Sequence, residues 1–376
     1  MVQSEKMKKS NQIDMLHGTL WKSILIFALP IALSNILQQL FNSVDMAVVG
    51  QFGGDDALAA VSANATVTAL FVNIVAGLSV GPNVIVAKLV GQDRKREIQD
   101  AVHTVIAFAF CLGIFALAVG ELVEKPILMA VSTPEGILGL AEQYLRIYFI
   151  GLPFAVLYNF GAAILRSVGD TRRPLYCLIF SGLLNACLNL ILVVGFHLGV
   201  AGVAIATSVS NMVSASLILW LLFHEEEPIR LSLHGICMKK EFLLQILKVG
   251  TPAALQSAVF SISNVCIQSG INSFKENAIS GSTVGLTLEY FTFFVISAFG
   301  QAAVTFSSQN YGARRLDRCK KICWICMAEG MLLTMVLSAV FTIWGRQFVG
   351  LYTTNSVVMS YALIRMHHVM MIEFLV

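Results

Sequence analysis

The 376-residue chain alternates between long apolar runs and short polar connections. Runs of about 18–25 apolar residues are long enough for an α-helix to cross the roughly 30 Å hydrocarbon core of a bilayer. The pattern predicts spans at residues 23–49, 57–89, 100–120, 141–165, 174–195, 200–222, 245–270, 281–309 and 322–344. A tenth run begins near residue 357. We therefore predict an all-α membrane protein.

The composition supports this prediction. Hydrophobic residues make up 57% of the chain and charged residues only 12%, whereas a soluble domain is about one-quarter charged. A chain this long with so few charges needs lipid as its outer solvent. The net charge of +3 is small, and we expect no nucleic-acid partner.

Basic residues occur in every second connection between the predicted spans. They lie in segments 6–22, 94–96, 166–173, 230–240 and 314–321. Because cytoplasmic loops are enriched in Lys and Arg, we predict that the N-terminus is cytoplasmic. We expect a multi-pass protein of the plasma membrane (cell inner membrane).

The chain also contains an internal repeat. ALPIALSN around Pro30 aligns with GTPAALQS around Pro252, and AKLVGQDRK aligns with SQNYGARRL, at offsets of 222 and 221. One repeat holds six spans, an even number, so both repeats have the same orientation in the membrane. We predict a six-helix lobe at 1–222, a cytoplasmic linker at 223–244, and a partial second lobe at 245–376. That lobe would hold about three and a half helices, which suggests a truncated chain.

The first span carries a stripe of polar side chains. Asn35, Gln38, Asn42 and Asp45 are spaced by three, four and three residues, which places them within about 80° of one helix face. Lipid does not tolerate such a stripe, so we expect it to face the bundle interior or a watery cavity.

Other predicted spans carry matching polar positions: Ser181, Asn185 and Asn189 in the fifth, Thr207 and Asn211 in the sixth, and Asn64, Thr68 and Asn73 in the second. Such groups can simply join helices by hydrogen bonds. For Asn185 and Asn189 a functional role and a structural one both stay open.

Asp45 is the strongest candidate for chemistry. At the repeat offset of 222 it aligns with Ile267, so the scaffold shared by the two halves does not need this charge. A carboxylate beside amide oxygens can exchange a proton or bind a hard cation such as Na⁺. The alternative is an acid that reaches headgroup water.

Four segments together resemble the multidrug and toxic compound extrusion (MATE) family: PIALSNILQQLFNSVDMAVVG, VGQDRKREI, LRSVGDTRRPLY and LNLILVVGFHLGVAGVAIATSVSN. The resemblance implies twelve helices in two lobes arranged as a V, of which this chain would end within the tenth. It also implies a secondary transporter, not an enzyme, that exports cationic or amphiphilic compounds by antiport with H⁺ or Na⁺.

The resemblance further implies a coupling-ion site made of Asp45, Asn185, Asn189 and Thr207. Asn189 departs from the family, which often has an acid there, so the coupling ion stays open. Some branches use acids of the second lobe, for which Glu289 and Glu373 are the candidates here. Gln256, Asn264 and Glu289, together with the stripe and Asn73, are candidates for the substrate cavity.

Two other functions fit fewer features of the sequence. A lipid-linked saccharide flippase of the same superfamily would need inward-facing basic residues, for which only Arg146 and Arg365 are available. A membrane enzyme would need clustered His and acids, and the H-E-x-x-H motif is absent. An inactive fragment is a third possibility. We expect drug-like substrates, a lipid environment, a monomer, and no cofactor beyond the coupling ion.

Overall fold

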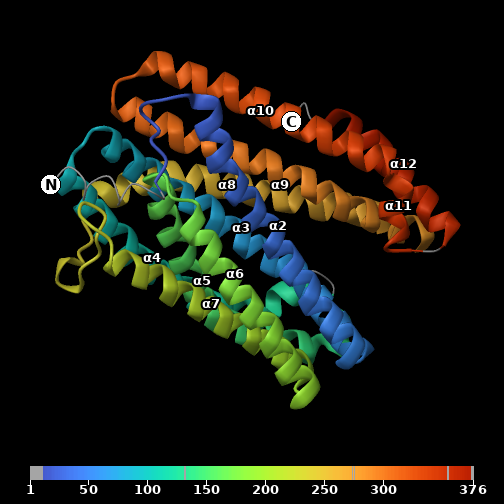
Figure 1. The fold of residues 1–376 in the computed structure, drawn as a ribbon. Helices are drawn as coiled ribbons and strands as arrows, with labels where there is room; N and C mark the ends of the chain where they lie inside the picture. Colours follow the sequence, from blue (N-terminus) through green and yellow to red (C-terminus); the bar gives the residue numbers. More distant parts are fainter. Residues whose placement is uncertain (1–11, 131–132, 273, 275, 354, 374–376) are drawn as a thin grey trace. The chain divides into compact units, whose positions relative to one another are not determined.

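The computed structural model describes residues 12–130, 133–272, 274, 276–353 and 355–373. Over these ranges the chain is helical almost throughout and contains no β-strand (Figure 1). The prediction of an all-α fold is therefore confirmed.

Nine helices within the described ranges are long and apolar enough to cross a membrane. They are α2 (Leu20–Phe52), α3 (Asp55–Gly91), α4 (Lys95–Ala130), α5 (Glu135–Ser167), α6 (Arg172–Asn189) with its extension η1 (Leu190–Gly195), α7 (Gly199–Phe223), α8 (Lys240–Asn272), α9 (Glu276–Gly312) and α10 (Leu316–Ile343). Each coincides with one predicted span, and only the span 322–344 ends outside its helix, one residue past Ile343. The remaining elements are η2 (Leu233–Gly235), α11 (Gly345–Gly350) and α12 (Ser356–Glu373).

Most helices extend beyond the predicted apolar run at one or both ends. At about 1.5 Å per residue, the 36 residues of α4 form a rod of about 54 Å, well beyond the hydrocarbon core and the predicted run 100–120. Backbone hydrogen bonding continues into the polar region, where hydropathy no longer marks the helix.

The chain forms two compact units. The first consists of Leu37–Ser261 with Gln12 and Ile13, and the second consists of Asp14–Ile36 with the described residues from Ile262 onward. The unit boundaries therefore fall inside α2 and inside α8. The first half of α2 belongs to the second unit, and the first half of α8 belongs to the first unit.

Helix α5 is the most enclosed helix of the first unit and packs against α3, α4 and α7. Close packing against α7 depends on a glycine. A Cβ at Gly151 would lie 2.7 Å from the Ser208 hydroxyl oxygen, a distance that real Cβ atoms essentially never show. Small residues that let helix backbones approach are typical of membrane interfaces.

Helices α3 and α8 approach even more closely within the first unit. Gly77 and Gly81 form a G-x-x-x-G motif on α3. A Cβ at Gly77 would lie 2.6 Å from the α-carbon of Ala254, and one at Gly81 would collide with the carbonyl oxygen of Ile246. Dispersion contacts between the two backbones therefore hold the first half of α8 in this unit.

Helix α9 is the centre of the second unit, and both α10 and α12 pack along it (Figure 1). The N-terminal residues of the same unit join it from the other end of the sequence. The Phe27 and Phe306 rings meet edge to face with centroids 5.4 Å apart, and the Asn310 amide donates to the carbonyl of Met15 at 3.0 Å.

Candidate functional site

Helix α6 widens directly after Asn189. The next residues, Leu190–Gly195, form a π-helical turn, and the Phe196 N–H donates to the Ile191 carbonyl, five residues earlier, at 3.0 Å. Turns of this kind interrupt an α-helix at a cost and are frequent at functional sites. Asn189 is thus the last residue of the regular helix.

Four side chains close into a hydrogen-bonded ring in the first unit. The Asn189 amide nitrogen donates to Asp45 Oδ1 at 2.5 Å and to Asn185 Oδ1 at 3.2 Å. The Asn185 amide reaches the Thr207 hydroxyl at 3.4 Å, and that hydroxyl donates to Asp45 Oδ2 at 3.4 Å. These are the four residues that the sequence analysis assigned to the coupling-ion site, and they come from α2, α6 and α7.

The ring is almost sealed from solvent. Asp45 is 8% exposed, Asn185 5% and Asn189 0%. A buried carboxylate needs donors to replace its lost hydration, and here two donors converge on it. Asn189 Oδ1 is buried and has no hydrogen-bond partner among the described residues, so the ring retains one unused acceptor.

A glycine sets the distance between α2 and α6 at this point. The Phe41 ring occupies the space where a Cβ of Gly182 would be. Asp45 follows Phe41 by one turn on α2, and Asn185 follows Gly182 by three residues on α6. The close approach of Phe41 to Gly182 therefore brings the acid and the amides within reach of one another. The sequence analysis missed Gly182, because its spacing carries no polar signal.

The rest of the predicted stripe does not join the ring. Gln38 and Asn42 are exposed, and Asn35 is half-buried in the part of α2 that belongs to the second unit. Asn73 of α3 donates to the Ser261 hydroxyl of α8 at 2.9 Å, which joins two helices.

The remaining cavity candidates are divided between the two units. Gln256 is exposed on the part of α8 in the first unit, and Asn264 is half-buried on the part in the second. Glu289, 6% exposed, forms a two-pronged ion pair with Arg365, whose Nε and Nη2 donate to the two carboxylate oxygens at 2.8 Å each. Glu373 accepts a hydrogen bond from the Thr292 hydroxyl at 2.6 Å.

Both basic residues considered for phosphate binding are paired with acids. Arg365 is bound to Glu289, and Arg146, 62% exposed, lies 3.3 Å from Glu121 and 3.2 Å from Glu124. Neither arrangement favours a lipid-phosphate site. Within the described residues no three His, Cys, Asp or Glu side chains converge as metal ligands.

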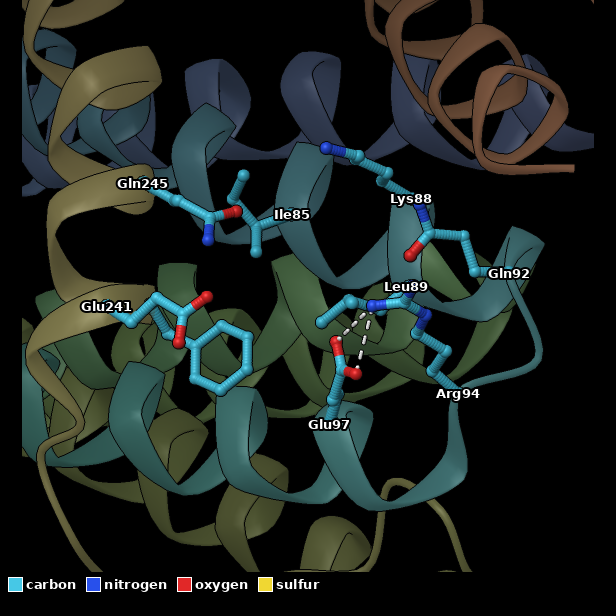
Figure 2. A pocket seen from close by; sticks show the side chains of 9 residues that line it. Ile85, Lys88, Leu89, Gln92, Arg94, Glu97, Glu241 and Gln245 are labelled. Carbon is cyan, nitrogen blue, oxygen red and sulfur yellow. Dashed lines mark hydrogen bonds and ion pairs between the residues drawn. The ribbon is translucent and has the colours of Figure 1, made fainter. Parts of the chain in front are cut away.

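A separate small cavity, of about 130 Å³, lies in the first unit where α3 ends and α4 and α8 begin (Figure 2). Its charged lining residues carry both signs: Lys88, Arg94, Glu97 and Glu241. Arg94 donates to both oxygens of Glu97, so much of this charge is neutralised within the cavity wall. The cavity shares no residue with the ring.

Comparison with known proteins gives consistent matches. The sequence profile of the MatE family matches residues 30–191 and 252–375. A probable multidrug resistance protein of Bacillus subtilis, YoeA, is 28% identical over 344 residues, which are 90% of this chain and 74% of that protein. A second from the same bacterium, YpnP, is 30% identical over 301 residues, covering 80% and 67%.

Solved structures match as well. One described as the outward-facing conformation of a multidrug resistance MATE family transporter of the MOP superfamily has a TM-score of 0.90 at 22% sequence identity. The match covers 97% of this chain and 82% of that one. It supports the helical fold described above.

Proposed function

Because this chain belongs to the MatE family of multidrug transporters, we propose that it exports cationic or amphiphilic small molecules by antiport with H⁺ or Na⁺, and that the Asp45 ring binds the coupling ion. The chain is a multi-pass membrane transporter and not an enzyme. We place it in the plasma membrane with its N-terminus in the cytoplasm, on the alternation of basic connections.

The observation that carries the proposal is the ring itself. Asp45 is the only carboxylate in it, and the other three members are neutral donors and acceptors. A buried ionisable group in a membrane helix is costly and is typical of ion pathways.

The ring geometry favours a proton over Na⁺. Asn189 and Thr207 both direct hydrogens at Asp45, as they would toward an ionised carboxylate. If the Asn189 side-chain amide rotates so that Oδ1 faces Asp45, a protonated Asp45 can donate to that oxygen. Asn189 Oδ1 is the buried acceptor without a partner among the described residues. Na⁺ would require several oxygens to turn inward together.

In this scheme a proton that enters from outside binds Asp45. The hydrogen bond between Asp45 and Asn189 then reverses its direction, and α2, α6 and α7 repack. The repacking expels the drug, and loss of the proton to the cytoplasm restores the ring for the next drug.

The test is drug efflux in a pump-deficient bacterial strain that expresses the 376-residue chain, measured over a range of pH and of sodium concentration. The variant is Asp45→Asn, which keeps the shape of the side chain but cannot ionise. The matched control is Asp56→Asn, at an exposed position. We expect Asp45→Asn to lose efflux driven by an ion gradient and Asp56→Asn to retain it. Normal efflux by Asp45→Asn would show that the ring is not the coupling site.

A further inference from the structure

Helix α10 carries an acid that the sequence analysis passed over. Glu329 lies near the middle of Leu316–Ile343, in a helix that qualifies as a membrane span. Both of its carboxylate oxygens are buried, and neither has a hydrogen-bond partner among the residues that the structure describes. A negative charge in such a place would have lost its hydration without any donor to replace it.

The stripe of α10 next to Glu329 is packed and weakly polar. Glu329 precedes Gly330, where a Cβ would lie 3.4 Å from the Phe299 side chain of α9. The hydroxyls of Thr334 and Ser338, further along α10, are also buried without a partner in the described part of the chain. This stripe of α10 therefore holds buried hydroxyl groups that form no hydrogen bond to a described residue in this conformation.

Glu289, Arg365 and Glu373 on the neighbouring helices have partners of their own. Helices packed on α10 bring Glu289, Tyr290 and Tyr311 from α9, Arg346 from α11, and Tyr361, Arg365, His367, His368 and Glu373 from α12; α10 itself adds Cys319, Cys323 and Cys326. Glu289 pairs with Arg365, and Glu373 bonds to Thr292. Of the side chains described, none forms a hydrogen bond or ion pair with Glu329.

Any cation that neutralises the Glu329 carboxylate must therefore be small in size. The two carboxylate oxygens are covered by protein atoms, so a metal ion or an organic ammonium group has no room beside them in this conformation. A proton needs no room. We propose that Glu329 is a proton-binding site of the second unit, protonated in this packing, which gives its proton to water when α10 and the helices packed on it part enough to admit water.

The step is a simple proton transfer. The O–H bond of the Glu329 carboxyl breaks, its electron pair stays on the carboxylate, and water becomes hydronium.

Infrared spectroscopy of the 376-residue chain in lipid tests the protonation directly. A protonated carboxyl has a carbonyl stretch separate from that of a carboxylate, and the stretch shifts in D₂O. We expect this band to lose intensity at neutral pH in Glu329→Gln and to stay unchanged in Asp317→Asn, an exposed acid on the same helix. If Glu329→Gln does not fold, Glu329→Asp should shift the band. Spectra of a folded Glu329 variant identical to those of the wild type would overturn the proposal.

The transport part of the proposal rests on the proposed function, and its readout is the pH profile of efflux. We expect Glu329→Gln to lose part of the pH dependence seen in the wild type, while Asp317→Asn follows the wild type. An unchanged profile in Glu329→Gln would show that the proton is bound but static, and would overturn the transport role. If the wild type itself exports nothing, the proposed function fails, and the infrared result still decides the protonation.

Discussion

Asn189 is the position where a second acid would change the ring most. Its amide nitrogen lies 2.5 Å from Asp45 Oδ1, and the two residues are 0% and 8% exposed. The substitution Asn189→Asp keeps the shape of the side chain but replaces this donor by an oxygen. Two carboxylates then face each other where little water can separate them.

The size of the effect follows from Coulomb's law. Two unit charges about 4 Å apart interact by about 4 kcal/mol at an effective dielectric constant of about 20. A cation that bridges both carboxylates removes this repulsion, and each 1.4 kcal/mol or so corresponds to about tenfold in affinity. The upper limit is therefore roughly a thousandfold tighter binding of Na⁺. Since a proton shared by the two acids competes with Na⁺, we expect a gain of at least about tenfold, largest at high pH.

Equilibrium binding of radioactive sodium to the purified chain, at several pH values, measures this gain. The control is Gln51→Glu, which adds the same charge at an exposed position of the same helix. We expect no increase in affinity for the control. A folded Asn189→Asp protein that binds Na⁺ no more tightly than the wild type would refute the close approach of positions 45 and 189 on which the prediction rests.

Two further predictions concern packing and a buried ion pair, both read by thermal unfolding of the solubilised protein. Gly81→Val should destabilise the fold by about 1–3 kcal/mol, because its side chain collides with the Ile246 carbonyl in a packed interface. The control Gly300→Val, in open space, should cost far less. Equal losses of stability in the two variants would contradict the packing. Arg365→Leu leaves Glu289 buried without a counter-charge and should cost about 3–5 kcal/mol, most of which a second change, Glu289→Leu, should recover. A double variant no more stable than the single one would argue against the pair.

The elements of the fold could be predicted from the sequence because lipid imposes a simple rule. A span must be apolar over its whole length, so hydropathy finds it without knowledge of its neighbours. The ring was a more specific prediction. Asp45 was singled out as an intramembrane charge, while Asn185, Asn189 and Thr207 were added by the resemblance to a family. Their roles remain predictions, although the structure brings all four together.

The other features of the fold and the site depend on contacts between residues far apart in the sequence, which a hydrophobic pattern does not reveal. The pattern of α2 and α8 does not indicate that their two halves belong to different units, because each forms one continuous helix. The π-helical turn after Asn189 lies in an unbroken apolar run, LILVVG, and leaves no trace in the pattern. Glu329 is a different case. The rule that an intramembrane acid is costly applied to it as well as to Asp45, but no stripe of polar neighbours drew attention to it.

The shared helices have a consequence for how the protein is made. Asp14–Ile36 leaves the ribosome first, yet the partners of Met15 and Phe27 in the second unit are Asn310 and Phe306, which are synthesised almost 300 residues later. The first half of α2 must therefore wait in the bilayer, unpacked, while α3 to α8 are inserted. The first unit is incomplete until the start of α8 arrives. The second unit is formed from two separate segments of the chain, so the contacts that join them can form only after both segments have been inserted.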